Sequence, residues 1–183
     1  MNKTAIGLAL TAGLLLPYNL LAQMDTGRSS VVAISKQMGV PVEGDFKRFN
    51  AQVSFDPAKP AQARASVEID IASFDIGAED YNREVRKPEW FDAARFPKAS
   101  FVTTAIKSVG AGRYEASGRL TIKGVSRNVV APVSFRAQGT QQVFEGVLPI
   151  RRLHYNIGTG EWKDTSLVAD EVQVRFRIVI NKK

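Results

Sequence analysis

The feature that most constrains the fold of this chain is an alternation of apolar and polar residues, from which we predict eight separate strands, although the first of them, residues 29–36, is apolar on both faces. Alternation with a period of two is typical of β-strands that bury one face. The segments are residues 29–36, 47–56, 64–72, 99–106, 113–123, 128–136, 142–150 and 171–180. Strands with one apolar and one polar face belong to antiparallel sheets that are wetted on one side. The sequence therefore predicts an all-β protein.

The links between most of these segments are short, which favours either a closed up-and-down barrel or a sandwich. A closed barrel has no exposed edge strands, and eight strands enclose an interior that either fills with side chains or holds one small ligand. The alternation is the same in a barrel and in a sandwich. At this level the two architectures stay open.

One stretch, at about residues 78–96, interrupts the alternation. Its first part is charged and tolerant of helix, and its second part is a turn bracketed by Pro88 and Pro97. Proline cannot continue a helix, and it pushes the residue before it towards extended geometry. We therefore expect one short helical insertion here. The turn carries three aromatic residues that need a surface to pack against, and a barrel mouth is the surface that we predict.

The N-terminal residues 1–22 have the layout of a secretory signal peptide. Lys3 supplies the positive start, an apolar run follows, and Ala22 is the small residue before the expected cleavage site. The apolar run is too short to span a membrane. We expect residues 23–183 to form one mature domain outside the cytoplasm.

Composition excludes several classes of function. The chain has no cysteine, which rules out disulfides, thiolate chemistry and zinc or iron–sulfur sites with cysteine ligands. The net charge is +7, from 25 basic and 18 acidic residues. The basic residues are scattered along the chain, so we expect a diffusely basic surface and no nucleic-acid partner.

Several separated stretches resemble the signatures of the YceI-like family. They are an Asp-to-Val opening at Asp25–Val31, residues 69–75, Trp90 to Pro97 with Phe101 after it, residues 118–126, and residues 155–158 followed by 170–172. The resemblance covers nearly all of the chain after residue 25. It implies a lipocalin-like, eight-stranded antiparallel barrel in the periplasm, with an apolar cavity that takes a polyisoprenoid or similar lipid.

Two positions depart from the family pattern. Thr26 and Arg28 stand in the opening motif, where the family often has a proline and a histidine. This departure leaves the choice of ligand head group open. The pathway and the oligomeric state also stay open, with a dimer among the alternatives.

No arrangement of residues predicts catalysis, a metal or a cofactor. His154 is the single histidine, and the chain has no G-x-S-x-G turn around a nucleophilic serine. Asp164, Asp170 and Glu171 lack the spacing of a calcium loop. The pair Gly158-x-Gly160 lacks the strand-to-helix context of a dinucleotide site. We therefore expect a protein that binds without turnover.

Two alternatives rest on other residues. Carboxylates at 79–92 lie among arginines and lysines, and they would serve acid–base catalysis on a lipid if burial shifted a pKa; a solvated, salt-bridged helix is the simpler interpretation. Arg83 and Arg86 are candidate contacts for a ligand head group. The other alternative is a filled barrel that binds a partner protein.

The predicted ligand is an isoprenoid, an isoprenoid quinone or a similar lipid, and transient contact with a membrane surface is expected. Any β-core needs inward hydrophobes, so only the family resemblance favours a hollow interior over a filled one. The residues predicted to line the cavity and its mouth are Phe49, Phe55, Val67, Ile69, Ile71, Trp90, Phe91, Phe96, Phe101, Leu120, Ile122, Val133, Phe135, Phe144, Leu148, Ile157, Trp162, Val174, Phe176 and Ile178.

Overall fold

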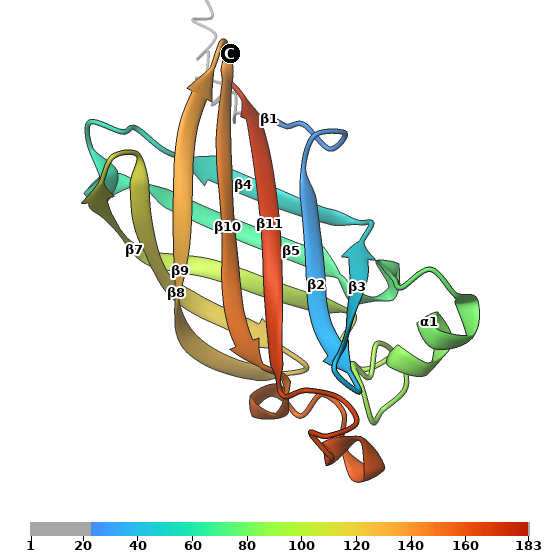
Figure 1. Ribbon diagram of the computed structural model, residues 1–183. Helices are drawn as coiled ribbons and strands as arrows, with labels where there is room; N and C mark the ends of the chain where they lie inside the picture. Colours follow the sequence, from blue (N-terminus) through green and yellow to red (C-terminus); the bar gives the residue numbers. More distant parts are fainter. Residues whose placement is uncertain (1–22, 183) are drawn as a thin grey trace, which may run out of the picture.

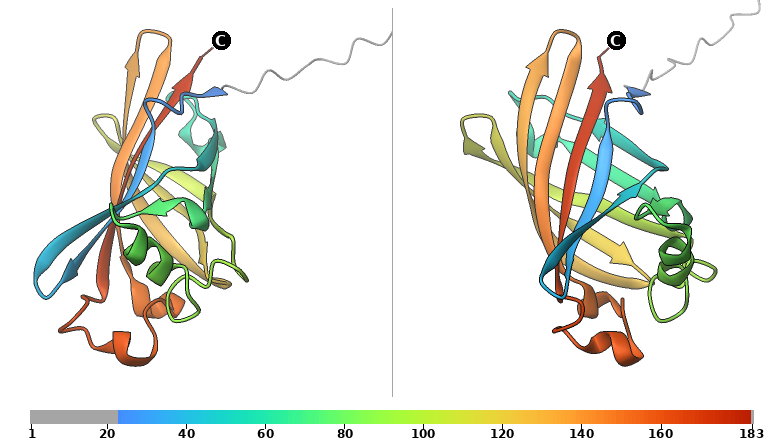
Figure 2. Two further views of the ribbon diagram at one scale, coloured as in Figure 1. Left: turned by 90° about the vertical axis from the view of Figure 1, so that its right-hand side faces the viewer. Right: turned by 45° about the vertical axis from the view of Figure 1, so that its right-hand side comes forward.

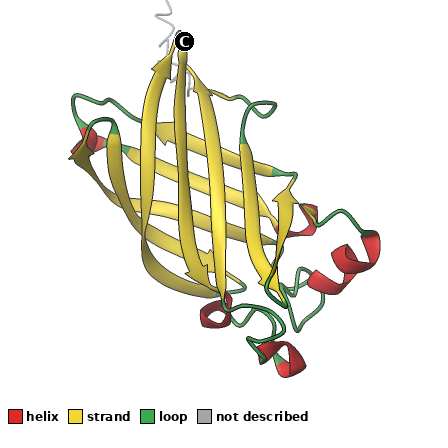
Figure 3. Cartoon of the chain, in the orientation of Figure 1, coloured by secondary structure: helices red, strands yellow, loops and turns green. Residues whose placement is uncertain are grey.

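The structure, a computed structural model, describes residues 23–182. It is one strongly curled antiparallel sheet with one short α-helix (Figures 1 and 3). The strands are β1 (Gln23–Met24), β2 (Ser30–Gln37), β3 (Val40–Phe46), β4 (Phe49–Ser54), β5 (Arg64–Asp70), β6 (Phe74–Asp75), β7 (Lys98–Gly110), β8 (Arg113–Ile122), β9 (Val125–Gln138), β10 (Gln141–Arg151) and β11 (Glu171–Asn181). The predicted signal peptide, residues 1–22, lies outside the described residues.

The prediction of an antiparallel all-β fold is confirmed, and the predicted number of strands is wrong. Each of the eight predicted segments coincides with a strand, but the sheet has eleven strands within residues 23–182. Two of the additional strands, β1 and β6, have only two residues each. The third is β3, where Val42, Gly44 and Phe46 alternate with polar residues. Pro41 and Gly44 are uncommon inside strands, and they obscured this pattern.

The strands form one path rather than a closed ring or two packed sheets. Their order is β4-β5-β7-β8-β9-β10-β11-β2-β3-β6, and β1 pairs with β11. The path ends at β4 on one side and at the two-residue strand β6 on the other, and the chain itself joins these sides, because β3, the neighbour of β6, leads directly into β4. At this bend the Lys47 amide donates to the Ser73 carbonyl at 3.1 Å, and the Asp70 amide donates to the Arg48 carbonyl at 3.0 Å. The curled sheet therefore encloses an interior, although its pairing is not continuous all round.

The predicted helical insertion at 78–96 is correct only in its first half. Helix α1 spans Glu79–Val85, and the residues after it form hydrogen-bonded turns. Pro88 limits the helix, because it disfavours helical geometry at Lys87. Asn82 fixes the helix to β6, since its side chain bonds the Asp75 carboxylate at 3.0 Å and the Ile76 amide at 2.9 Å. No helix within residues 23–182 has the length and apolarity needed to cross a bilayer.

Strands β9 and β10 pair over only part of their length. Residues 134–138 of β9 pair with 141–145 of β10, and beyond that point β9 follows β8 while β10 follows β11. The divergence begins where Gly146 passes Pro132. A Cβ atom on Gly146 would lie 2.1 Å from the Pro132 carbonyl oxygen, so only glycine permits this approach. Pro132 has no N–H with which to continue the ladder.

Short 3₁₀ helices and loops gather at one end of the sheet. Two of them are η3 (Arg152–Tyr155) and η4 (Gly160–Lys163), both between β10 and β11. Figure 2 shows these segments and α1 at the same end of the molecule, next to the hairpin that joins β2 to β3. Segments far apart in the sequence therefore meet at this end.

Candidate functional site: an apolar cavity and its mouth

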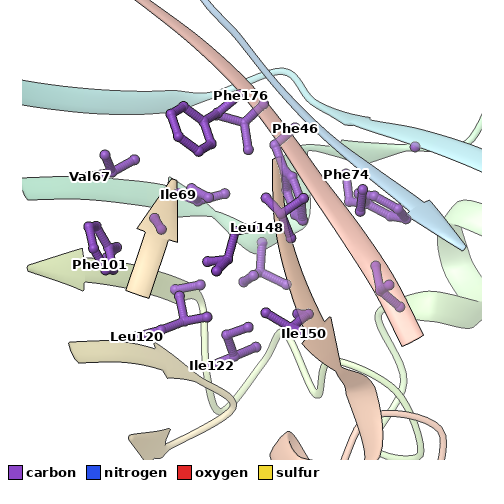
Figure 4. Close-up of a pocket in the computed structure, with 18 of the residues that line it drawn as sticks. Phe46, Val67, Ile69, Phe74, Phe101, Leu120, Ile122, Leu148, Ile150 and Phe176 are labelled. Carbon is purple, nitrogen blue, oxygen red and sulfur yellow. The ribbon is translucent and has the colours of Figure 1, made fainter. Parts of the chain in front are cut away.

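The curled sheet encloses a cavity of about 330 Å³. Its lining comes from β2 to β11 and from α1, and nearly all of it is hydrocarbon. In Figure 4 the labelled side chains, among them Phe46, Leu148 and Phe176, point from different strands into a common space. The alternation seen in the sequence places these side chains, because every second residue of a strand faces the interior. The interior is hollow rather than filled by the protein's own side chains.

The structure places seventeen of the twenty predicted residues in the cavity lining. They are Phe55, Val67, Ile69, Ile71, Trp90, Phe91, Phe101, Leu120, Ile122, Val133, Phe144, Leu148, Ile157, Trp162, Val174, Phe176 and Ile178.

Three predicted residues lie outside the lining. Phe49 packs against the hydrophobic core beside the bend between β3 and β4. Phe96 lies against Gly124, with the Arg95 guanidinium 5.3 Å from its ring centre. Phe135 packs behind Phe55 and Phe144, in the second layer of an aromatic cluster.

This aromatic cluster lies near the β9–β10 hairpin. The Phe55 ring centre lies 5.1 Å from that of Tyr114 and 5.3 Å from that of Phe144. The buried Gln142 fixes the chain here, because its side-chain amide donates to the Phe55 carbonyl at 3.2 Å. Edge-to-face aromatic pairs of this kind are favourable beyond the area that they bury. The cluster forms a rigid inner end for the cavity.

The opposite end lies at the predicted mouth. Trp90 packs against Trp162 with ring centres 5.3 Å apart, and both rings line the cavity. Phe91 contacts Phe74 at 5.6 Å. Tyr81 of α1 also belongs to the lining, although it is 59% exposed. The cavity therefore meets the surface beside α1.

Arg152 organises the mouth, and the sequence analysis did not single it out. The side chain is only 2% exposed, and burial lowers the pKa of its guanidinium, an effect that the nearby Asp170 opposes. Its guanidinium lies 5.9 Å from the ring centre of Trp90. It donates five hydrogen bonds of 2.6–3.0 Å to the carbonyl oxygens of Ile157, Gly158, Trp162, Val168 and Ala169. One cation therefore holds the loop between β10 and β11 in shape.

Further contacts join this loop to the turn after α1. The Lys123 ammonium donates to the Pro88 carbonyl at 2.6 Å and to the Asn156 carbonyl at 2.7 Å, and burial lowers its pKa. The Glu89 carbonyl accepts from the amides of Gly158 and Thr159, both at 2.8 Å. Three of the stretches that carry the family resemblance thus meet at the mouth. We name residues 87–97 and 152–170 together the mouth cap.

Residues missed by the sequence analysis also include Phe46 and Phe74, whose ring centres lie 4.8 Å apart. Both line the cavity, and the Phe74 ring lies directly over Gly44. The alternation of residues in β3 could have predicted that the Phe46 side chain faces the interior. Phe74 follows a short 3₁₀ turn, so no periodic pattern in the sequence predicts which way its side chain points.

The two candidate head-group arginines lie outside the lining. Arg83 is exposed and pairs with Asp80 on the same helix. Arg86 lies 3.8 Å from Glu79, and its Nε atom is buried with no hydrogen-bond partner among the described residues. The indole nitrogen of Trp90 is likewise buried and unpartnered. These two donors lie close to the mouth.

Four of the five carboxylates at residues 79–92 pair with a lysine or an arginine, and Glu89 is the exception. Among the described residues, Glu84 is the only carboxylate that lines the cavity, and it pairs with Lys87. The buried Asp92 carboxylate lies 3.4 Å from the Arg95 guanidinium. This arrangement agrees with the salt-bridged interpretation of the segment. Within residues 23–182 no group of three or more acidic or histidine side chains has a metal-binding geometry.

A family model described as the YceI-like domain matches residues 23–180. The chain belongs to the YceI-like family. The resemblance found in separate motifs is therefore confirmed over the whole described structure.

Several solved structures share this fold. The crystal structure of Burkholderia cenocepacia BcnA is 54% identical, covers 86% of this chain and 99% of its own, and superposes with a TM-score of 0.85. A Campylobacter jejuni YCEI protein is 23% identical over 78% of this chain and 85% of its own, with a TM-score of 0.71. A polyisoprenoid binding domain from Saccharophagus degradans is 18% identical over 89% of this chain and 99% of its own, with a TM-score of 0.72.

Curated sequences add a shorter match. The UPF0312 protein of Pseudomonas syringae pv. tomato is 33% identical over 98 residues, which are 54% of this chain and 51% of that protein. The chain thus spans about half the length of the curated relatives that it matches.

Proposed function

We propose that this protein binds and carries an apolar chain, without chemical turnover. The chain is a polyisoprenoid, an isoprenoid quinone or a similar lipid, and it occupies the cavity. The observation that carries this proposal is a cavity of about 330 Å³ with an almost wholly hydrocarbon lining. Small-molecule sites of proteins measure about 300–1,000 Å³. The Saccharophagus domain of the same fold, described as polyisoprenoid binding, gives independent support.

Hydrophobic transfer alone supplies enough affinity. Each buried methylene contributes about 0.8 kcal/mol, so one five-carbon isoprene unit contributes about 4 kcal/mol. A few units approach the practical ceiling of about −18 to −21 kcal/mol for non-covalent binding, before ordering costs are subtracted. The tail therefore supplies the affinity. The room between the aromatic cluster and the mouth limits how much of the tail is buried.

Polar contacts at the mouth would then orient the ligand. A buried donor without a partner costs about 1–3 kcal/mol, and the indole N–H of Trp90, a residue that lines the cavity, is in that state. The Arg86 Nε–H is also without a partner among the described residues, but Arg86 lies outside the lining. A carbonyl or hydroxyl oxygen at the end of the lipid is the group that satisfies such donors. Arg83 fits this role less well, since it is exposed and paired.

We place the protein outside the cytoplasm, in the periplasm, on the signal-peptide pattern of residues 1–22. Beside the mouth, the β2–β3 hairpin exposes Met38 and Val40, which are 70% and 62% exposed. The Met38 amide donates to the carbonyl of Leu167, another exposed hydrophobe, at 2.8 Å. We propose that this apolar tip contacts the membrane during cargo exchange. The net charge of +7 attracts anionic lipid, although salt screens this attraction.

The decisive experiment is organic extraction of the purified protein, followed by mass spectrometry. Ala131 is buried and lines the cavity from β9, so Ala131→Phe fills the space. Its neighbour Val130 is exposed, which makes Val130→Phe the matched control. We expect an apolar chain in the wild-type and Val130→Phe extracts and at least a tenfold depletion in Ala131→Phe. Equal extracts from all three proteins would refute a cavity ligand.

The membrane contact has a separate test. The double variant Met38→Ser, Val40→Ser should transfer cargo to anionic vesicles several-fold more slowly while it retains the cargo itself. Val109→Ser changes an exposed valine at the far end of β7 and serves as the control. Unchanged transfer in the double variant would remove the hairpin tip from the proposal and leave cavity binding intact.

A further inference from the structure

A second concave site lies between the diverging halves of β9 and β10. This groove has a volume of about 600 Å³ and is closed at one side by η3. Its floor and walls include Arg127 and Asn128 from β9 and Arg151 from β10. It shares only one lining residue, Ile150, with the apolar cavity. The groove is therefore a separate site with polar walls.

The groove contains two arginines without acidic partners. Among residues 23–182 no carboxylate lies within ion-pair distance of Arg127 or Arg151. Arg127 uses Nε to bond the His154 carbonyl at 3.0 Å, which leaves its terminal nitrogens available. Glu171 lies opposite Arg151 in the β10–β11 register and is the acidic residue of the lining. The groove therefore carries a net positive charge.

Tyr155 supplies a fixed donor at the same place. The residue is only 2% exposed and packs in the core, yet it lines the groove. Within the described part of the chain, its hydroxyl has no hydrogen-bond partner and is not among the fully buried polar atoms. Since Tyr155 lines the groove, its hydroxyl is the polar group that this residue offers to a ligand there. Burial raises the pKa of Tyr155, so the hydroxyl keeps its proton and remains a donor.

Three stretches that carry the family resemblance converge on this groove. Residues 118–126 contribute Ser126, residues 155–158 contribute Tyr155, and residues 170–172 contribute Glu171. None of these three side chains lines the apolar cavity.

We propose that this groove binds a phosphate group. The terminal nitrogens of Arg127 and the guanidinium of Arg151 donate to the phosphate oxygens, because a planar guanidinium group can form bidentate hydrogen bonds with phosphate. The Tyr155 hydroxyl donates from below, while Asn128 and His154 add side-chain donors at the rim. These hydrogen-bond donors outnumber the one carboxylate of the groove, Glu171. The groove is therefore better suited to an oxyanion than to a cation. A soluble phosphate ester and a phospholipid head group both present this chemistry.

Titration with inorganic phosphate and glycerol phosphate, followed by ³¹P NMR and calorimetry, tests the site. Arg151→Ala removes one charge, and Tyr155→Phe removes only the hydroxyl while it keeps the buried ring. We expect each variant to weaken phosphate binding roughly tenfold, since hydrogen bonds to a charged group are stronger than those between neutral groups. Arg113→Ala, an exposed arginine at the far end of β8, is the charge-matched control and should bind as the wild type does.

Wild-type protein that takes up no phosphate at millimolar concentration would overturn the proposal. Equal weakening by Arg113→Ala would also overturn it, because general charge would then explain the binding. Thermal unfolding of each variant verifies that the fold is intact. Tyr155→Phe retains the packed ring, so it keeps the test valid if Arg151→Ala unfolds.

Vesicles distinguish the two sources of phosphate. Preferential binding to phosphatidylcholine vesicles that contain phosphatidic acid, lost in Arg151→Ala, assigns the groove to a lipid head group. Binding of free phosphate with no preference for these vesicles assigns it to a soluble ester. Extracted cargo should be unchanged in Arg151→Ala and Tyr155→Phe. Loss of cargo in both variants would overturn the groove as a separate site.

Discussion

The cavity wall and the mouth cap are held together by different forces. The wall consists of strands whose inward hydrophobes pack without directional bonds, and many side chains of similar size would fill the same positions. The mouth cap depends on Arg152, whose five hydrogen bonds each need a particular carbonyl in a particular place. The cavity wall should therefore tolerate conservative substitutions, whereas the mouth cap requires particular residues at particular positions. We expect substitutions in the mouth cap to lower the unfolding free energy more than substitutions of similar size in the cavity wall.

The sharpest test of this contrast is Arg152→Met, which keeps much of the volume and removes every donor. We expect a loss of roughly 3–5 kcal/mol in unfolding free energy, since each buried carbonyl that loses its partner costs about 1–3 kcal/mol, and removal of the buried charge, which no longer has to be desolvated, offsets part of that cost. Urea titration at neutral pH measures it. Arg151→Met changes the exposed neighbour and should stay within about 0.5 kcal/mol of wild type. A loss below about 1 kcal/mol in Arg152→Met would contradict the central role of this residue.

A second pair of variants compares the cavity wall with the close-packed core. Ile180 is fully buried and lies outside the lining, so Ile180→Ala should cost about 4 kcal/mol. Leu148 borders the cavity, where its side chain already has empty space on one side. Leu148→Ala should therefore cost only about 2 kcal/mol, near the low end for such truncations. Equal losses by urea titration would mean that the wall is as tightly packed as the core.

Two glycines in the mouth cap sharpen the comparison further. Both have left-handed backbones, with φ of +72° at Gly158 and +66° at Gly160. A Cβ atom on Gly158 would lie 2.2 Å from Nη1 of Arg152, whereas one on Gly160 would meet open space. We expect Gly160→Ala to lower the unfolding free energy by about 1 kcal/mol through backbone strain alone. Gly158→Ala should cost about 2–3 kcal/mol, and a result equal to that of Gly160→Ala would show that the arginine shifts freely.

The smallest effect is expected on the outer face of the sheet. Glu145 pairs with Arg136 and Arg177, and hydrogen bonds from Arg136 first and Arg177 second lower its pKa below the ordinary value of 4.5. Because the folded pKa is depressed, this stabilisation is present above pH 4.5 and is lost as the pH falls through the folded pKa. Partial exposure limits it to less than about 1 kcal/mol. Glu145→Gln should flatten the loss of stability between pH 7 and pH 3.5 in urea titrations. An identical acid dependence in wild type and variant would exclude this contribution.

The sequence predicted the cavity wall well because a strand has a fixed period. Once β8 is identified, Leu120 and Ile122 must face the same side, and the same holds for Phe176 and Ile178 on β11. In the aromatic turn, Trp90 and Phe91 line the cavity. Phe96 does not, because a turn has no period, and its ring packs on Gly124 instead.

Two features were decided only when distant segments came together. Arg152 follows a strand as one of two adjacent arginines, and nothing in the sequence distinguishes it from the exposed Arg151. Its five partners become visible only where the loop folds around it. The groove lies between the parts of β9 and β10 that do not pair, beyond the pairing of residues 134–138 with 141–145, and those strands reach it from different parts of the chain.

By itself, the sequence determined the eight longer strands other than β3, the inward faces of most of them, the family and the apolar character of the interior. Each of these follows from a local period or a local motif. The tertiary structure alone decided that the interior is hollow, that one buried cation holds the mouth, and that a basic groove opens beside it. Those properties depend on distances between strands and on hydrogen bonds to main-chain carbonyls, which no local pattern encodes.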